Sequence, residues 1–161
     1  TYPKWSIVTY QFPALGDSPP VTLKWWDGHK LPDRPAELDA GRKFPENGSM
    51  FVGDKGKMLV IDTDSPRLLP EEKMKGFEQP KPFLPRVRDH KGEWLDAVRG
   101  GPPASSNFTD YGGPLAECVL LGNLAIAAGK KIDWDNDNLQ ATNAPEVAPF
   151  IHREYRKGWG I

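Results

Sequence analysis

The stretch Ser106–Asp135 decides the fold of this chain. It begins S-N-F-T-D-Y-G-G-P-L-A-E, continues as an almost wholly apolar run, and ends with G-K-K-I-D-W-D. Pro114 suits the first turn of a helix, where its missing amide hydrogen costs nothing, and Gly129 suits the end of one. Only Glu117 and Asn123 interrupt the apolar surface. The pattern therefore predicts a long helix that is buried nearly all round.

Shorter elements are predicted on both sides of this helix. Asp89–Arg99 spaces its apolar residues as on one helix face and stops at a Gly-Gly pair. Glu71–Gly76 predicts a single helical turn, which a proline-rich connector follows. Lys130–Trp134 predicts a strand, and Asn143 predicts the cap of a last helix that runs through Tyr155.

The first third of the chain predicts β structure, because β-branched and aromatic residues dominate its apolar runs. Alternation places Val21, Leu23 and Trp25 on one face of a strand and the intervening residues on the other. The polar, proline-broken segment Gly28–Gly48 predicts a surface loop, and G-D-K-G predicts a hairpin turn. The predicted strands are Trp5–Phe12, Val21–Asp27, Met50–Val52, Lys57–Ile61 and a short edge strand in Pro66–Pro70.

Composition limits the class of protein. The chain has 161 residues, of which 38% are hydrophobic and 11% aromatic, which predicts one folded domain over residues 1–161. A net charge of −1 gives no attraction to nucleic acid or anionic lipid, so neither is expected as a partner. Cys118 stands alone in an apolar run and is expected to be packing. With no signal peptide and no spanning helix evident, we expect a soluble protein and leave its compartment open.

Several kinds of chemistry are not indicated by the sequence. Gly53 and Gly56 give only G-x-x-G between two predicted strands, so no dinucleotide site, and hence no cofactor-binding residue, is expected. His29, His90 and His152 are isolated, with no second ligand at helical spacing, so no metal site is expected. No G-x-S-x-G is present for a nucleophilic serine. We assign no catalytic residue.

Tryptophans beside carboxylates are the strongest signal for a ligand. An indole ring stacks on the apolar face of a sugar while a carboxylate accepts its hydroxyl protons. Two other interpretations remain open: W-D-G ends a strand without a ligand, and D-W-D-N-D-N is a loop with one buried tryptophan. The residues before the long helix either cap it or line a pocket. The candidate substrate-binding residues are Trp25, Trp26, Asp27, His29, Asn107, Asp110 and Tyr111.

The order of these motifs resembles the C-terminal region of the bacterial Gfo/Idh/MocA oxidoreductases, named after glucose–fructose oxidoreductase and inositol dehydrogenase. The resemblance covers nearly the whole chain, from P-K-W-S-I-V through W-W-D-G, G-S-M-F-V-G-D-K-G-K, H-K-G-E-W-L-D-A-V-R-G-G and S-N-F-T-D-Y-G-G-P-L-A-E to R-E-Y-R-K-G-W. Together with the order of strands before helices, it implies an α+β fold with an open, mainly antiparallel sheet covered on one face by helices.

The resemblance also implies a function. A Rossmann domain upstream of Thr1 would bind NAD or NADP and carry the E-K-P and D-x-x-x-H motifs, neither of which occurs here. This chain would supply the pocket for a sugar or polyol substrate and a homo-oligomer interface in a bacterial protein of the cytoplasm or periplasm, and would be inactive alone. The alternatives are a stand-alone carbohydrate-binding or dimerisation module, and a domain of an NAD-dependent glycosidase of the same wider family.

Overall fold

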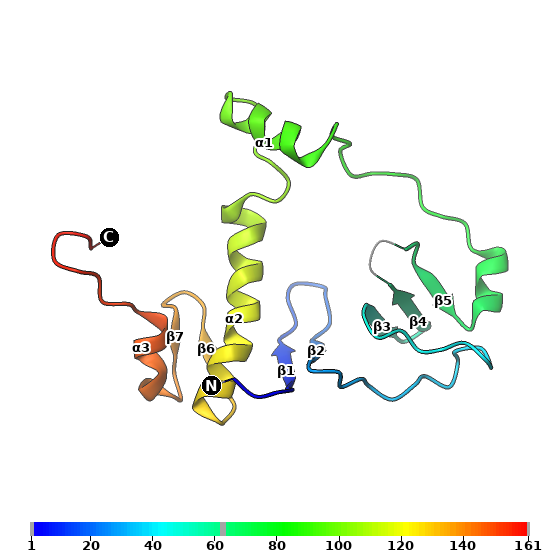
Figure 1. Ribbon diagram of the computed structural model, residues 1–161. Coiled ribbons are helices and arrows are strands. Elements are labelled where there is room, and N and C mark those ends of the chain that lie inside the picture. Colours follow the sequence, from blue (N-terminus) through cyan, green and yellow to red (C-terminus); the bar gives the residue numbers. More distant parts are fainter. Residues whose placement is uncertain (1, 62–63, 161) are drawn as a thin grey trace. The chain divides into compact units, whose positions relative to one another are not determined.

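The computed structural model describes residues 2–61 and 64–160 and has an α+β fold (Figure 1). The α+β class and the antiparallel pairing predicted from the sequence are confirmed, since the four strand pairs in the described residues are all antiparallel. In the described residues the strands form three small sheets, of two, three and two strands. The chain divides into two compact units, Thr1–Leu84 and Pro85–Ile161, and the boundary lies in the proline-rich connector.

The first unit begins with a two-stranded ribbon of β1 (Ile7–Phe12) and β2 (Val21–Trp26). Cross-strand partners share a face, so one face of the ribbon is entirely apolar, as the alternation predicted. This face is half-buried or exposed along its whole length. A two-stranded hairpin is only marginally stable in water, so it needs a covering partner. We call it the hairpin face; its residues are Val8, Tyr10, Phe12, Val21, Leu23 and Trp25.

A three-stranded sheet follows in the same unit. It contains β3 (Ser49–Gly53), β4 (Gly56–Val60) and β5 (Arg67–Leu69), with β4 in the centre. The predicted G-D-K-G hairpin and the short edge strand are thus both confirmed. The sheet and the loop before it enclose a small core, whose buried residues Leu38, Leu59 and Leu69 pack with Phe44, Met50 and Ile61.

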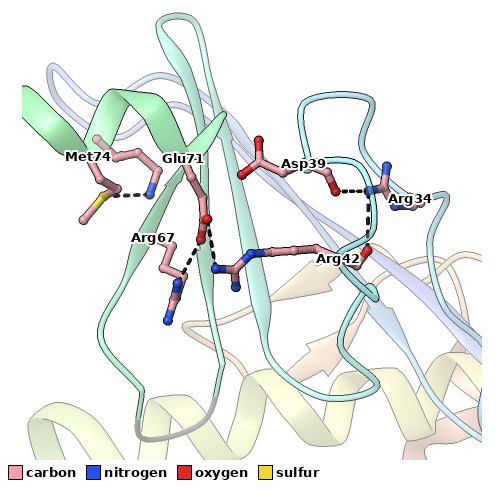
Figure 2. A network of polar contacts seen from close by, with 7 residues as sticks. Arg34, Asp39, Arg42, Arg67, Glu71 and Met74 are labelled. Atoms are coloured by element: carbon pink, nitrogen blue, oxygen red, sulfur yellow. Dashed lines mark hydrogen bonds and ion pairs between the residues drawn. The ribbon is translucent and has the colours of Figure 1, made fainter.

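Charged side chains hold the long loop before β3 against the three-stranded sheet (Figure 2). Arg34 donates to the main-chain oxygen of Asp39 at 2.7 Å. Its guanidinium group also donates to the main-chain oxygens of Leu38 and Arg42 in the same loop. Arg42 pairs with Glu71 at 2.9 Å, and Arg67 donates to the same carboxylate at 2.8 Å. The hydrogen bond from Arg67 holds the pKa of Glu71 below its usual value. Glu71 opens the single helical turn η1 (Glu71–Gly76).

The second unit begins with helix α1 (His90–Val98), close to its predicted limits. Asp89 caps the helix, since its carboxylate accepts from the Gly92 amide at 2.8 Å. That hydrogen bond holds the pKa of Asp89 below its usual value. Glu93 reaches forward from the first turn and accepts from both the amide and the hydroxyl of Ser105, at 2.9 and 3.1 Å. The helix is therefore tied to the loop that follows it.

The long helix α2 (Gly113–Ala128) follows the wide helical turn η2 (Phe108–Gly112). Pro114 lies in its first turn, and Gly129 ends it in a left-handed conformation, with φ at 65°. Both ends agree with the prediction.

The remaining short elements pack against one side of α2. They are β6 (Trp134–Asp135), β7 (Gln140–Ala141), the turn η3 (Pro145–Val147) and α3 (Ala148–Ile151), drawn beside α2 in Figure 1. Together they enclose the core of the second unit. Its buried residues Leu124, Ala141, Ala144 and Val147 are joined by Leu121, Ala128, Ile132, Trp134 and Ile151.

The prediction that α2 is buried nearly all round is wrong. Only Gly122 and Leu124 of this helix are buried. Leu115, Val119 and Leu120 are 50%, 45% and 60% exposed. Within the second unit, the short elements after the helix pack on the side that bears Leu124.

Two smaller predictions also need correction. The strand expected at Lys130–Trp134 is reduced to β6, because a side chain fixes the start of this segment in a loop. The Asn143 amide group donates to the Lys131 carbonyl at 2.9 Å and accepts from the Asp133 amide at 2.8 Å. Asn143 therefore does not cap the last helix. That helix ends with α3 and does not reach Tyr155.

Candidate functional site

At the end of β2 the chain folds back onto the residues before β1. The Asp27 amide donates to the Ser6 carbonyl at 3.0 Å, and the Asp27 carboxylate accepts from the Gly28 amide at 2.7 Å. Gly28 has a φ of +66° and packs so closely on the backbone of Lys4 and Trp5 that a side chain would overlap it. Only glycine fits this turn without strain.

This turn gathers an aromatic ring and several polar groups, which we call the β2 corner: Trp5, Trp26, Asp27, His29 and Lys30. The Lys30 ammonium lies over the Trp5 ring, 4.9 Å from its centroid. His29 has a φ of +63°, a conformation uncommon outside glycine. Asp27, His29 and Lys30 are exposed, so a carboxylate, an imidazole and an ammonium group are available to a polar ligand.

The two adjacent tryptophans do not act together. Trp25 pairs with Val8 on the apolar hairpin face, whereas Trp26 pairs with Ile7 on the opposite face. Trp25 is 52% exposed and Trp26 is half-buried. Of the predicted residues in this unit, only Trp26, Asp27 and His29 therefore belong to one corner. Trp25 belongs to a surface that suits packing better than sugar recognition.

The predicted residues of the second unit lie at the start of η2. Asn107 accepts from the Asp110 amide at 2.9 Å, and its amide group donates to the Asp110 carboxylate and the Ala104 carbonyl, each at 3.1 Å. These contacts are those of a helix cap, the simpler of the two interpretations. Tyr111 is 55% exposed beside them.

The D-W-D-N-D-N segment consists of the short strand β6 and the turn that follows it. Trp134 is half-buried in the core of the second unit and donates from Nε1 to Glu117 at 2.6 Å. Asp135 accepts from Asn138 and Gln140, and these hydrogen bonds hold its pKa below its usual value. The interpretation of this segment as a loop with one packed tryptophan is supported over sugar contact.

Sequence reasoning missed Trp5 and Lys30. The sequence predicts Trp5 as the first residue of a strand, but β1 begins two residues later, and the Trp5 ring lies against the Lys30 ammonium. Lys30, two positions after W-D-G, was the available signal, because a four-residue turn from Asp27 to Lys30 reverses the direction of the chain.

The described residues bear on a dinucleotide site, a metal site and the single thiol. Gly53 and Gly56 pair with each other at the tight turn between antiparallel strands, so they do not precede a helix N-terminus and do not fit a dinucleotide. Within residues 2–61 and 64–160, no group of three His, Cys, Asp or Glu side chains is placed to hold a metal ion. Cys118 is half-buried, and burial raises the pKa of its thiol.

The helical stretch Phe108–Ala128 is long and apolar enough to cross a membrane, judged by its length and composition alone. A single helix of this kind is weak evidence for a membrane span, because core helices of soluble proteins can have the same length and composition. Neither a protein-family model nor a curated protein matches this sequence.

Proposed function

We propose that this chain supplies the substrate pocket and a subunit interface of an NAD(P)-dependent sugar or polyol oxidoreductase whose cofactor is held by a separate Rossmann domain. The proposal begins from the ordered series of motifs that resembles the Gfo/Idh/MocA enzymes. The observation that supports it most is the β2 corner, where Asp27, His29 and Lys30 are exposed beside the Trp5 ring.

The chemistry of this corner suits a polyhydroxylated ligand. The Asp27 carboxylate accepts hydrogen bonds from hydroxyl groups, and the Lys30 ammonium donates to them. An indole ring gives the apolar side of a sugar a surface to stack on. All these groups bind and orient a substrate, so the hydride transfer and its proton transfer are left to the cofactor-binding part.

The test is to assay the native protein that carries this sequence for sugar-dependent reduction of NAD or NADP, over a panel of sugars and polyols. Asp27→Asn is expected to raise KM for the sugar about tenfold or more, as loss of a charged hydrogen bond would. Asp17→Asn is the matched control, since Asp17 lies in the turn at the other end of the same ribbon. No reduction with any sugar, or equal kinetics for the two variants, would contradict the proposal. Release of an aglycone without net reduction would favour the related glycosidases.

A second candidate is a stand-alone carbohydrate-binding module. It is favoured by Trp5, which is about half exposed and lies beside the Lys30 ammonium in the β2 corner. This function predicts that sugars quench the tryptophan fluorescence of the chain alone, and that Trp5→Ala removes the effect. A tight dimer that sugars do not affect would instead favour a dimerisation module.

A further inference from the structure

Asn47 and Gly48 form the one Asn-Gly pair in the 161-residue sequence, and they lead directly into β3. Both residues are exposed. Within residues 2–61 and 64–160, no hydrogen bond engages the side-chain amide of Asn47 or the main-chain amide of Gly48. Water therefore reaches both groups, and neither is withheld from a reaction with the other.

The packing of the β3–β4 hairpin requires glycine at position 48. Its φ of +130° is a conformation that residues with side chains rarely adopt. A Cβ atom there would lie 2.5 Å from the Val60 carbonyl oxygen, which is too close for a side chain. Asn47 is therefore followed by a residue without a side chain, and this leaves room for the Asn47 side chain to close a ring with the main chain.

An asparagine in this position reacts with its own main chain. The Gly48 nitrogen loses its proton to water or hydroxide and attacks Cγ of Asn47, so that a succinimide ring forms and the side-chain nitrogen leaves as ammonia. Water then opens the ring at the side-chain carbonyl to give aspartate, or at the main-chain carbonyl to give isoaspartate. In sum, asparagine and water give an acid and ammonia, and nothing is oxidised or reduced.

We propose that Asn47 is a modification site, at which the folded chain deamidates with water as its only co-reactant, and that the isoaspartate product loosens the start of β3. Isoaspartate adds a methylene group to the main chain immediately before Gly48. The Gly48 backbone packs against the Val60 carbonyl, and Ser49 pairs with Val60 in the ladder. Aspartate leaves the length of the main chain unchanged, so it alters the charge alone.

Either product places a new carboxylate beside Glu46. Glu46 pairs with Lys43 at 2.8 Å, and the hydrogen bond from Lys43 holds the pKa of Glu46 below its usual value. Both side chains of this pair are exposed, so water screens the new charge and the pair changes little. The effect on the sheet is therefore expected from the longer main chain and not from the charge. The inference rests on this loop alone, and it needs neither the oxidoreductase proposal nor a ligand.

Mass spectrometry of the full chain after incubation near neutral pH tests the modification. We expect the peptide that contains residue 47 to become about 1 Da heavier, since a hydroxyl group replaces an amino group. The rate should rise at least about tenfold between about pH 6 and about pH 8, because the Gly48 nitrogen must lose its proton. Asn47→Gln should remove the change, because its longer side chain closes a ring less readily. Asn136 is the matched control in the same chain, since it is exposed in a turn but is followed by Asp137, whose side chain crowds the ring.

Comparison with the chain unfolded in guanidinium chloride shows whether the fold permits the reaction. The folded and unfolded chains should react at rates within about tenfold of each other, because the loop needs to open only locally. Protection of Asn47 by more than about 100-fold in the folded chain would overturn the proposal. Equal conversion of Asn136, or conversion that persists in Asn47→Gln, would also overturn it.

Hydrogen exchange tests the effect on the sheet. The amides of β3 and β4 should exchange at least about tenfold faster in the isolated isoaspartate form than in freshly prepared Asn47→Asp. This variant is the matched control, because it carries the same charge on a main chain of the ordinary length. Equal exchange in the two forms would overturn the proposed loosening of β3.

Discussion

Replacing Trp134 by phenylalanine should destabilise the second unit through one hydrogen bond. Nε1 of Trp134 donates to Oε1 of Glu117 at 2.6 Å, and both side chains are half-buried. Glu117 is the only charged residue of α2, so this bond lets a carboxylate lie beside the core. A hydrogen bond to a charged group contributes about 1.5–3 kcal/mol, and partial exposure places this one near the lower end.

A double-mutant cycle separates this bond from the packing of the indole ring. Trp134→Phe alone loses the bond and part of the ring volume, and the same change in a Glu117→Leu background loses only the volume. We expect a coupling of about 1–2 kcal/mol between the two positions. The assay is urea unfolding followed by circular dichroism at the helix band, because the two longest helices belong to this unit.

The size of the coupling energy decides whether the hydrogen bond stabilises the second unit. A coupling below about 0.5 kcal/mol would mean that water satisfies the Glu117 carboxylate as well as Trp134 does. Glu117→Leu by itself should cost less than Trp134→Phe, since leucine suits an apolar helix face. If it costs more, the carboxylate has a second role that the hydrogen bond does not describe.

Three further predictions concern single residues. Because the pKa of Asp89 is lowered, its contribution to stability is present above its ordinary pKa and is lost as pH falls through the folded-state value. Asp89→Asn should keep the cap and remove this acid sensitivity of α1, which circular dichroism measured against pH would show. Gly28→Ala should destabilise the β2 corner by at least about 1 kcal/mol more in thermal unfolding than Gly16→Ala, because both glycines have positive φ but only Gly28 touches other backbone. Arg34→Lys should loosen the loop that Arg34 holds, seen as faster cleavage in limited proteolysis; equal rates would contradict it.

Local signals in the sequence predicted the elements well. Proline and glycine gave the ends of α2, and G-D-K-G gave the hairpin of β3 and β4, because such turns need particular backbone angles. Asp89 gave the start of α1. Long-range contacts were not predictable. The hydrogen bond between Asn143 and Lys131 that replaces the expected strand joins residues 12 positions apart. The contact of Lys30 with Trp5 joins two residues that have the whole ribbon between them in the sequence.

The candidate site shows the same contrast between features that local signals predict and features that depend on long-range contacts. Capping by Asn107 follows from local chemistry, since an asparagine before a helix accepts from an amide three residues on. The separation of Trp25 from Trp26 also follows from strand alternation. The β2 corner did not follow, because it depends on how Gly28 packs against the backbone of Trp5. The burial of α2 was overestimated because an apolar sequence indicates that a helix favours contact with other apolar groups, but does not indicate which part of the protein makes that contact.

Stability should therefore depend on association. The two units have cores of only three and four buried apolar residues among those described, while Val21 and Trp25 in β2 and Leu115 and Leu120 in α2 are each half exposed or more. Cores this small leave little surplus over conformational entropy, so contacts with a second copy would carry much of the stability. If the exposed side chains of α2 belong to the proposed subunit interface, unfolding is linked to dissociation, and each tenfold rise in concentration adds about 1.4 kcal/mol per dimer. The midpoint of thermal unfolding of the helices should rise with chain concentration, and Leu120→Asp should abolish that rise. A midpoint independent of concentration in the unchanged chain would show that α2 gains no stability from a second copy.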